Sequence, residues 1–303
     1  MQNQLSNGKD RTQANSQNTI SISLCDGRTL AYAEYGNPCG KPVFFFHGTP
    51  GSRFFHPPDE ITARLNVRLI CADRPGFGES TFQPGRCFLD WPADIAQLAQ
   101  YLGIDRFAVA GHSGGGPYVL ACAYAIPEHV IAAAVISGTG PVNLPSSTDG
   151  MTPLNKFGFK FGQYLPWVIG RPLIWLLFRE RCADPAKALD RKIGIRPPAD
   201  DELIARPEVR QVCLQSEVEA FRQGLKGLGW DVRLITHPWE FRLEEIKSPV
   251  YLWHGTVDNM ASISTTQYMA QKIPHGKLTI CEGEGHLLLF PHWEEILTQL
   301  TSE

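Results

Sequence analysis

Short apolar runs divide this chain into a regular series of buried segments. The runs at 42–46, 67–72, 106–110, 130–137 and 249–254 are five to eight residues long and do not alternate between apolar and polar side chains. Runs of this length and kind are typical of strands that are covered on both faces. They predict the strands of one central sheet.

Helical patterns lie between several of these predicted strands. Residues 91–102 place apolar side chains in a stripe and end before Gly103, and residues 117–125 carry the small and apolar side chains of a helix packed on a sheet. An alternating hairpin over 19–35 precedes the series, and a short strand at 277–281 follows it. Strand and helix in alternation predict an α/β fold: a mostly parallel sheet with right-handed crossovers and helices on both faces.

The pattern changes between residues 141 and 240, which carry no buried β run. Helix-like segments with clustered aromatic side chains and frequent prolines predict an all-helical cap, inserted into a core of residues 19–140 and 241–303. Most of these aromatic residues are expected to form the cap's own core, and a minority to line a cleft; Trp167 and Trp175 are the candidates for binding substrate.

Composition and charge restrict the partners of the protein. Lysine and arginine number 28 against 31 aspartates and glutamates, so charge gives no reason to expect nucleic acid or an acidic membrane surface. The eight cysteines are scattered without a C-x-x-C pair, and no His tract has metal-ligand spacing, so no metal site is predicted. A small-molecule substrate is the expected partner, and the oligomeric state is left open.

No targeting segment is recognisable in the sequence. Residues 1–18 are rich in Asn, Gln and Ser, a composition that predicts a disordered tail rather than a signal peptide. The longest apolar stretch, 173–178, is too short to cross a bilayer. The expected location is the cytoplasm.

One stretch carries a chemical signal. Residues 111–115 read Gly-His-Ser-Gly-Gly between a predicted strand and a predicted helix, which fits the G-x-S-x-G nucleophile elbow. Glycines at the ends of this motif let strand and helix approach closely while Ser113 is lifted clear of the fold. The amide of Gly114, at the start of the helix, can then stabilise an oxyanion formed by attack of the serine.

A serine hydroxyl needs a base to take its proton and a carboxylate to orient that base. Asp258 and His286 each follow a predicted strand, and the order Ser113, Asp258, His286 is the order of the triad in α/β hydrolases. The glycine-rich loop after the strand at 42–46 lies at the same edge of the sheet, and the Thr49 amide is the candidate for a second oxyanion donor.

Other polar residues near these loops fit structural roles better. His47 is expected to hold its loop through its ring nitrogens. His112 precedes the nucleophile and is expected to point away from it, and His254 lies several residues before the acid loop. Asp73 is expected to accept hydrogen bonds from turn amides, with Arg74 pairing nearby.

Five motifs together resemble the α/β-hydrolase superfamily, in its capped branch of esterases, lipases and small-substrate hydrolases. The resemblance covers residues 19–140 and 241–303, and it implies an eight-stranded, mostly parallel sheet with an antiparallel second strand and no cofactor. The motif HGTPG at 47–51 departs from the HGGPG familiar from proline iminopeptidases, which weakens an assignment to those enzymes. The motifs are HGTPG (47–51), DRPGFGES (73–80), GHSGG (111–115), GTVD (255–258) and GEGH (283–286).

Three classes of function stay open. The first is a serine hydrolase of small carboxylic esters, or in second place amides, that works through an acyl-enzyme. The second is another reaction of the same triad, such as C–C bond hydrolysis, lactone opening or a cofactor-free lyase reaction. The third is a non-catalytic ligand receptor on the same fold. Serine rather than aspartate at position 113 argues against haloalkane dehalogenases and epoxide hydrolases, which in this superfamily use an aspartate nucleophile.

Overall fold

The computed structural model describes residues 19–302 except 163, 165–166 and 192–194. The predicted tail, residues 1–18, lies outside the described residues. The strands are β1 (Ile20–Ser23), β2 (Thr29–Gly36), β3 (Lys41–Phe46), β4 (Val67–Ala72), β5 (Phe107–His112), β6 (Val130–Ile136), β7 (Val250–Gly255) and β8 (Gly276–Cys281). The helices that flank them are α2 (Asp59–Arg64), α3 (Trp91–Tyr101), α4 (Gly116–Ala125), α11 (Ile263–Lys272) and α12 (Trp293–Thr301).

All of these strands join in one eight-stranded sheet with the order β1-β2-β4-β3-β5-β6-β7-β8. Strand β2 runs antiparallel to its neighbours β1 and β4, whereas the pairs from β4 to β8 are parallel. The predicted fold class is therefore confirmed, including the antiparallel second strand.

Strand β3 shows why the buried runs do not alternate between apolar and polar residues. Phe44 and Phe46 pack on one face of the sheet with side chains of α3, α4 and α11. Val43 and Phe45 pack on the other face with α12. Because successive side chains of a strand point to opposite faces, a sheet covered on both sides needs apolar residues at every position.

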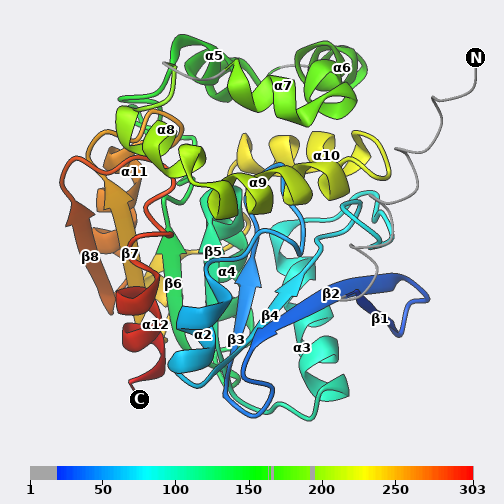
Figure 1. The fold of residues 1–303 in the computed structure, drawn as a ribbon, viewed down its shortest axis with the longest axis vertical. Helices are drawn as coiled ribbons and strands as arrows, with labels where there is room; N and C mark the ends of the chain where they lie inside the picture. The colour runs from blue at the N-terminus through cyan, green and yellow to red at the C-terminus, as the bar shows by residue number, and fades with distance from the viewer. Residues whose placement is uncertain (1–18, 163, 165–166, 192–194, 303) are drawn as a thin grey trace, which may run out of the picture.

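A group of helices is inserted between β6 and β7. Figure 1 shows them above the carboxyl ends of the parallel strands, with α8, α9 and α10 next to the sheet and α5, α6 and α7 in an outer layer. No strand interrupts this insertion in the part that the structure describes. Its limits at 141 and 240 stay a prediction. The inserted helices are α5 (Pro153–Gly162), α6 (Trp167–Ala183), α7 (Pro185–Asp190), α8 (Pro198–Ala205), α9 (Pro207–Ala220) and α10 (Lys226–Ile235).

Candidate active site

Ser113 stands at the sharp turn between β5 and α4, at the start of the short 3-10 turn η2 (Ser113–Gly115). Its φ is 54°, in the left-handed region that residues with a side chain rarely adopt. A Cβ on Gly111 would lie 2.8 Å from the carbonyl oxygen of Gly115, and a Cβ on Gly115 would collide with the carbonyl of Phe46. Both glycines are thus required for the turn that exposes the serine.

Asp258 and His286 come together at the same edge of the sheet, from the loops after β7 and β8. The Nδ1 atom of His286 donates to Oδ2 of Asp258 over 2.8 Å. The other carboxylate oxygen accepts the backbone amides of Met260 and Ala261 at 2.7 and 3.1 Å. Burial alone would raise the pKa of Asp258, but His286 and these hydrogen bonds hold it below its usual value. The carboxylate is therefore ionised and fixes the proton on Nδ1.

His112, the residue before the nucleophile, contacts the loop that carries His286. Its Nε2 donates to the carbonyl oxygen of His286 at 2.9 Å, and its ring lies 4.7 Å from the imidazole of His286. Burial, and then the nearby His286, lower the pKa of His112 to about 3. His112 is therefore neutral and holds the carbonyl group of His286, while its expected orientation away from Ser113 stays a prediction.

The loop after β3 lies against the nucleophile. A Cβ on Gly48 would lie 3.4 Å from Cβ of Ser113, and a Cβ on Gly114 would collide with the side chain of Thr49. His47 holds this loop from inside: its Nδ1 donates to the carbonyl of Gly48 at 2.8 Å and its Nε2 accepts from the amide of Arg74 at 3.3 Å. The structural role expected for His47 is confirmed.

A buried ionic network supports the same loop. Arg74 donates from Nη2 to the carbonyl oxygen of Gly48 and to the hydroxyl of Thr49, both at 2.9 Å. Arg74 and Thr49 in turn donate to Oδ2 of Asp231, at 2.7 and 2.9 Å. Asp231 belongs to α10, so this loop is joined to an inserted helix by a fully buried carboxylate.

Asp231 binds two further donors through its other oxygen. Tyr118 donates its hydroxyl at 2.6 Å, and Arg86 forms an ion pair with the same oxygen. Burial would raise the pKa of Asp231, but Arg74 and Arg86 outweigh it and lower that pKa well below its usual value. The sequence predicted a partner for Arg74 but contained no signal for Asp231, which lies 157 positions away.

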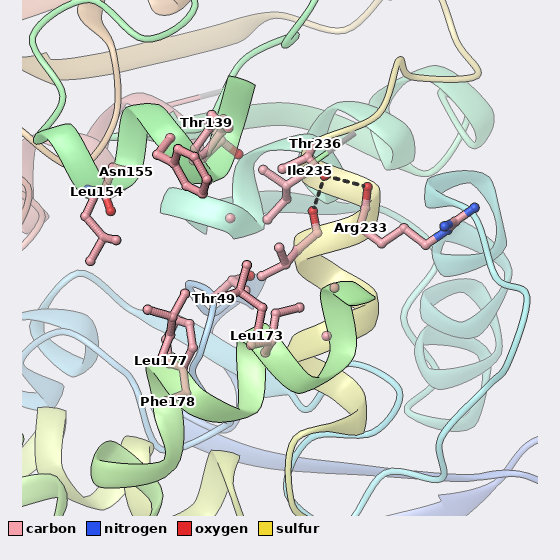
Figure 2. A pocket seen from close by; sticks show the side chains of 18 of the residues that line it. Thr49, Thr139, Leu154, Asn155, Leu173, Leu177, Phe178, Arg233, Ile235 and Thr236 are labelled. Carbon is pink, nitrogen blue, oxygen red and sulfur yellow. Dashed lines mark hydrogen bonds between the residues drawn. The ribbon is translucent and has the colours of Figure 1, made fainter. Parts of the chain in front are cut away.

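Two cavities meet at the serine. The larger, about 320 Å³, is lined by apolar side chains of α5, α6 and α10, and by Ser113, Thr49 and Gly114. Figure 2 shows Leu173, Leu177 and Phe178 of α6 close to Thr49. The smaller cavity, about 150 Å³, brings Ser113 and His286 to one wall and has more polar side chains around it.

Of the two tryptophans proposed to bind substrate, Trp175 can be placed, and it is not one of these wall residues. Trp175 does not line either cavity: its side chain is 54% exposed, and the guanidinium of Arg179 lies over its ring. At 100° per residue, the face of α6 that carries Leu173 and Leu177 points Trp175 away from the cavity. The side chain of Trp167 lies outside the described residues.

Comparison with known proteins settles the family. Residues 43–299, most of the chain, match the alpha/beta hydrolase family. The chain belongs to that family. Its fold is similar to the crystal structure of a hydrolase from Pseudomonas aeruginosa PA01, with a TM-score of 0.68 over 95% of this chain and 100% of that chain at 18% identity. The superfamily indicated by the five motifs is therefore confirmed.

The curated relatives of this α/β hydrolase match it over shorter segments. One is a proline iminopeptidase of Xylella fastidiosa (strain 9a5c), 40% identical over 116 residues, which are 35% of each chain. Another is a non-heme chloroperoxidase of Streptomyces lividans, 33% identical over 147 residues, or 45% of this chain and 51% of that protein. The chain thus matches about a third to a half of the length of these relatives, which differ in activity.

Helices that could span a membrane and clusters of metal-ligating side chains are both absent from the described part of the chain. Across the described ranges, no helix is both long and apolar enough to cross a membrane. Within the same ranges, no group of three His, Cys, Asp or Glu side chains is arranged to hold a metal ion.

Proposed function

We propose that this α/β hydrolase is a serine hydrolase that cleaves a small carboxylic ester through an acyl-enzyme. The observation that carries the proposal is the 2.8 Å contact between His286 and Asp258, with His286 lining the same cavity as the strained Ser113. The turn forces Ser113 into a strained backbone conformation, with φ of 54°, and it needs glycine at positions 111 and 115. A structural serine gains nothing from this conformation, whereas a nucleophile gains exposure.

The proposed mechanism follows from the proton on Nδ1 of His286. Because Asp258 holds that proton, Nε2 is the nitrogen that accepts the proton of Ser113 as Oγ attacks the substrate carbonyl. The amides of Thr49 and Gly114 would donate to the oxyanion. His286 then protonates the leaving alcohol, and a water molecule activated by the same histidine hydrolyses the acyl-enzyme. Each step uses protein groups and water alone.

The larger cavity supports a substrate with an apolar group. Its wall from α6 offers Leu173, Ile174, Leu177 and Phe178, and its volume of about 320 Å³ is at the lower end of small-molecule pockets. We infer that this cavity binds an apolar acyl or alcohol group of short to medium length, while the smaller cavity takes the other half of the substrate.

Amides are the second candidate substrates. The segment of 116 residues shared with a proline iminopeptidase favours them, since that relative is named as a peptidase. The HGTPG loop still differs from the HGGPG motif that is familiar from such enzymes. Esters and amides share the acyl-enzyme route, so the choice between them is a matter of rate.

Labelling with a fluorophosphonate probe tests the proposal first. We expect the wild-type chain to be labelled and Ser113→Ala not to be, because the probe reacts with a serine activated by a base. Absence of labelling in the folded wild type would refute the proposal and favour a receptor. A panel of p-nitrophenyl esters, amides and lactones, run on both chains, then ranks the substrates; hydrolysis of lactones alone would favour the alternative reaction of the triad.

A further inference from the structure

An aspartate of the inserted helices binds the backbone of the catalytic histidine. Asp200, in the first turn of α8, is 1% exposed. Its Oδ2 accepts the amide of His286 at 3.0 Å, and its Oδ1 accepts the amide of Leu287 at 2.8 Å. One carboxylate therefore holds two successive amides of the loop after β8.

The same peptide is held from its other side by the elbow. His112 donates to the carbonyl oxygen of His286 at 2.9 Å, so the N–H of this residue is bound by α8 and its C=O by the end of β5. Two opposed hydrogen bonds leave little freedom for the backbone that carries the imidazole. Because the side chain of His286 is anchored to Asp258 as well, the ring position depends on three different segments of the fold.

Gly285 explains how the carboxylate reaches these amides. A Cβ at position 285 would lie 2.5 Å from Oδ1 of Asp200, and the three nearest atoms to it all belong to that side chain. Any other residue would push the carboxylate away from the histidine loop. The φ of Gly285 is not among the positive values of this chain, so close approach, rather than backbone conformation, requires glycine here.

We propose that Asp200 is a positioning residue, which holds the loop of His286 from α8 and so places the imidazole for proton transfer with Ser113. This rests on the proposed function, because it assigns Asp200 a role in the same reaction without contact to the reacting atoms. A misplacement of a catalytic group by about 1 Å lowers the rate on the order of 100-fold. Asp200 does not line the larger cavity, but it lines the smaller one together with Ser113 and His286, so its replacement also changes the wall that holds the other half of the substrate.

The test compares Asp200→Asn with Glu202→Gln, a matched loss of charge on an exposed residue of the same helix. With the best ester from the panel, we expect Asp200→Asn to lower kcat about 10- to 100-fold and to slow fluorophosphonate labelling to the same degree. KM is not part of the prediction, because Asp200 also lines the smaller cavity. Glu202→Gln should match the wild type. A folded Asp200→Asn with wild-type kcat, or one that changes KM alone, would overturn the inference. If the wild type itself is not labelled, the proposed function fails instead.

Gly285→Ala keeps the proposal testable even where Asp200→Asn does not fold. It keeps the carboxylate of Asp200 but pushes it away from the amides of the histidine loop, so kcat should fall. A wild-type kcat would contradict the positioning role. When Asp200 is already replaced by Ala, Gly285→Ala should lower kcat little further, because the carboxylate that its Cβ would collide with is absent. If the losses in kcat of the two single variants simply added in the double variant, this would also count against the contact between position 285 and Asp200.

Discussion

Replacing Asp231 by Asn isolates the charge that joins α10 to Thr49 in the loop after β3. The asparagine has nearly the same size, but it removes the negative charge between Arg74 and Arg86 and turns an NH₂ group toward donors. Arg74 and Asp231 are fully buried, and the side chain of Arg86 is 2% exposed, so water cannot replace the lost partner. The substitution leaves two buried cations without their counter-charge.

The expected loss of stability follows from that burial. Removing one partner of a buried ion pair costs about 3–5 kcal/mol, since the remaining charge stays desolvated. A typical domain has a total free energy of unfolding of about 5–15 kcal/mol, so the variant should be folded but markedly less stable. We also expect kcat to fall, because Thr49 loses the carboxylate that its hydroxyl binds at 2.9 Å.

Urea unfolding of wild type and Asp231→Asn measures the difference. Asp105→Asn is the matched control, since that carboxyl is 91% exposed and its loss should change the free energy of unfolding by no more than about 0.5 kcal/mol. Combining Asp231→Asn with Arg86→Met should cost less than the sum of the single changes, because the second removes one unpaired cation. A loss no larger than that of the control would refute the reasoning, as would strict additivity.

The same carboxylate predicts a dependence of stability on pH. Because the folded protein holds the pKa of Asp231 below its usual value, the stabilisation is present above the unfolded pKa, about 3.9, and is lost as pH falls toward the folded value. The wild type should therefore lose more free energy of unfolding between neutral and acidic pH than Asp231→Asn does. If the free energy of unfolding fell with pH equally in the two chains, the pKa of this carboxyl would be the same in the folded and unfolded states.

Two further predictions concern the proposed reaction. Ser113→Ala and His286→Ala should each lower kcat by orders of magnitude, and the double variant should be scarcely worse, because the triad acts as a unit. In the wild type, kcat/KM should rise with pH as His286 loses its proton. Against esters of increasing acyl length, kcat/KM should rise about fourfold per methylene, from about 0.8 kcal/mol for each buried CH₂, until the larger cavity is full. Leu173→Ala should shift the preferred length and Trp175→Ala should not, so a flat profile or equal effects would reject the apolar cavity.

The core of the site could be predicted because local sterics dictate it. Ser113 is recognisable since glycines at 111 and 115 are the residues that a closely packed turn admits, whatever the rest of the chain does. Asp258 and His286 are recognisable because each follows a predicted strand, and parallel strands place such loops at one edge. These signals depend on neighbours in sequence or on the sheet, which the apolar runs reveal.

The wall of the larger cavity could not be predicted in the same way. Around Trp175, α6 is apolar on most sides, so no stripe in the sequence indicates which face turns inward. Size and aromaticity then favoured tryptophan, while the structure turns the face with Leu173 and Leu177 toward the cavity. Helical phase in such a segment is decided by its packing partners, which are distant in sequence.

The inserted helices divide into two layers with different consequences for the reaction. Each of α8, α9 and α10 sends one buried carboxylate into the loops of the core. Asp200 binds the histidine loop, while Glu219 forms an ion pair with Arg53 at 2.9 Å and Asp231 binds Thr49, both in the loop after β3. These three helices are therefore part of the scaffold that holds the catalytic groups. The outer helices α5 and α6 supply apolar wall, and α5 also reaches the loop of Asp258, because Asn155 donates to the carbonyl oxygen of Asn259 at 3.5 Å. We therefore expect changes in α6 to alter which substrate fits, and changes in α8 to α10 to alter how fast it is cleaved.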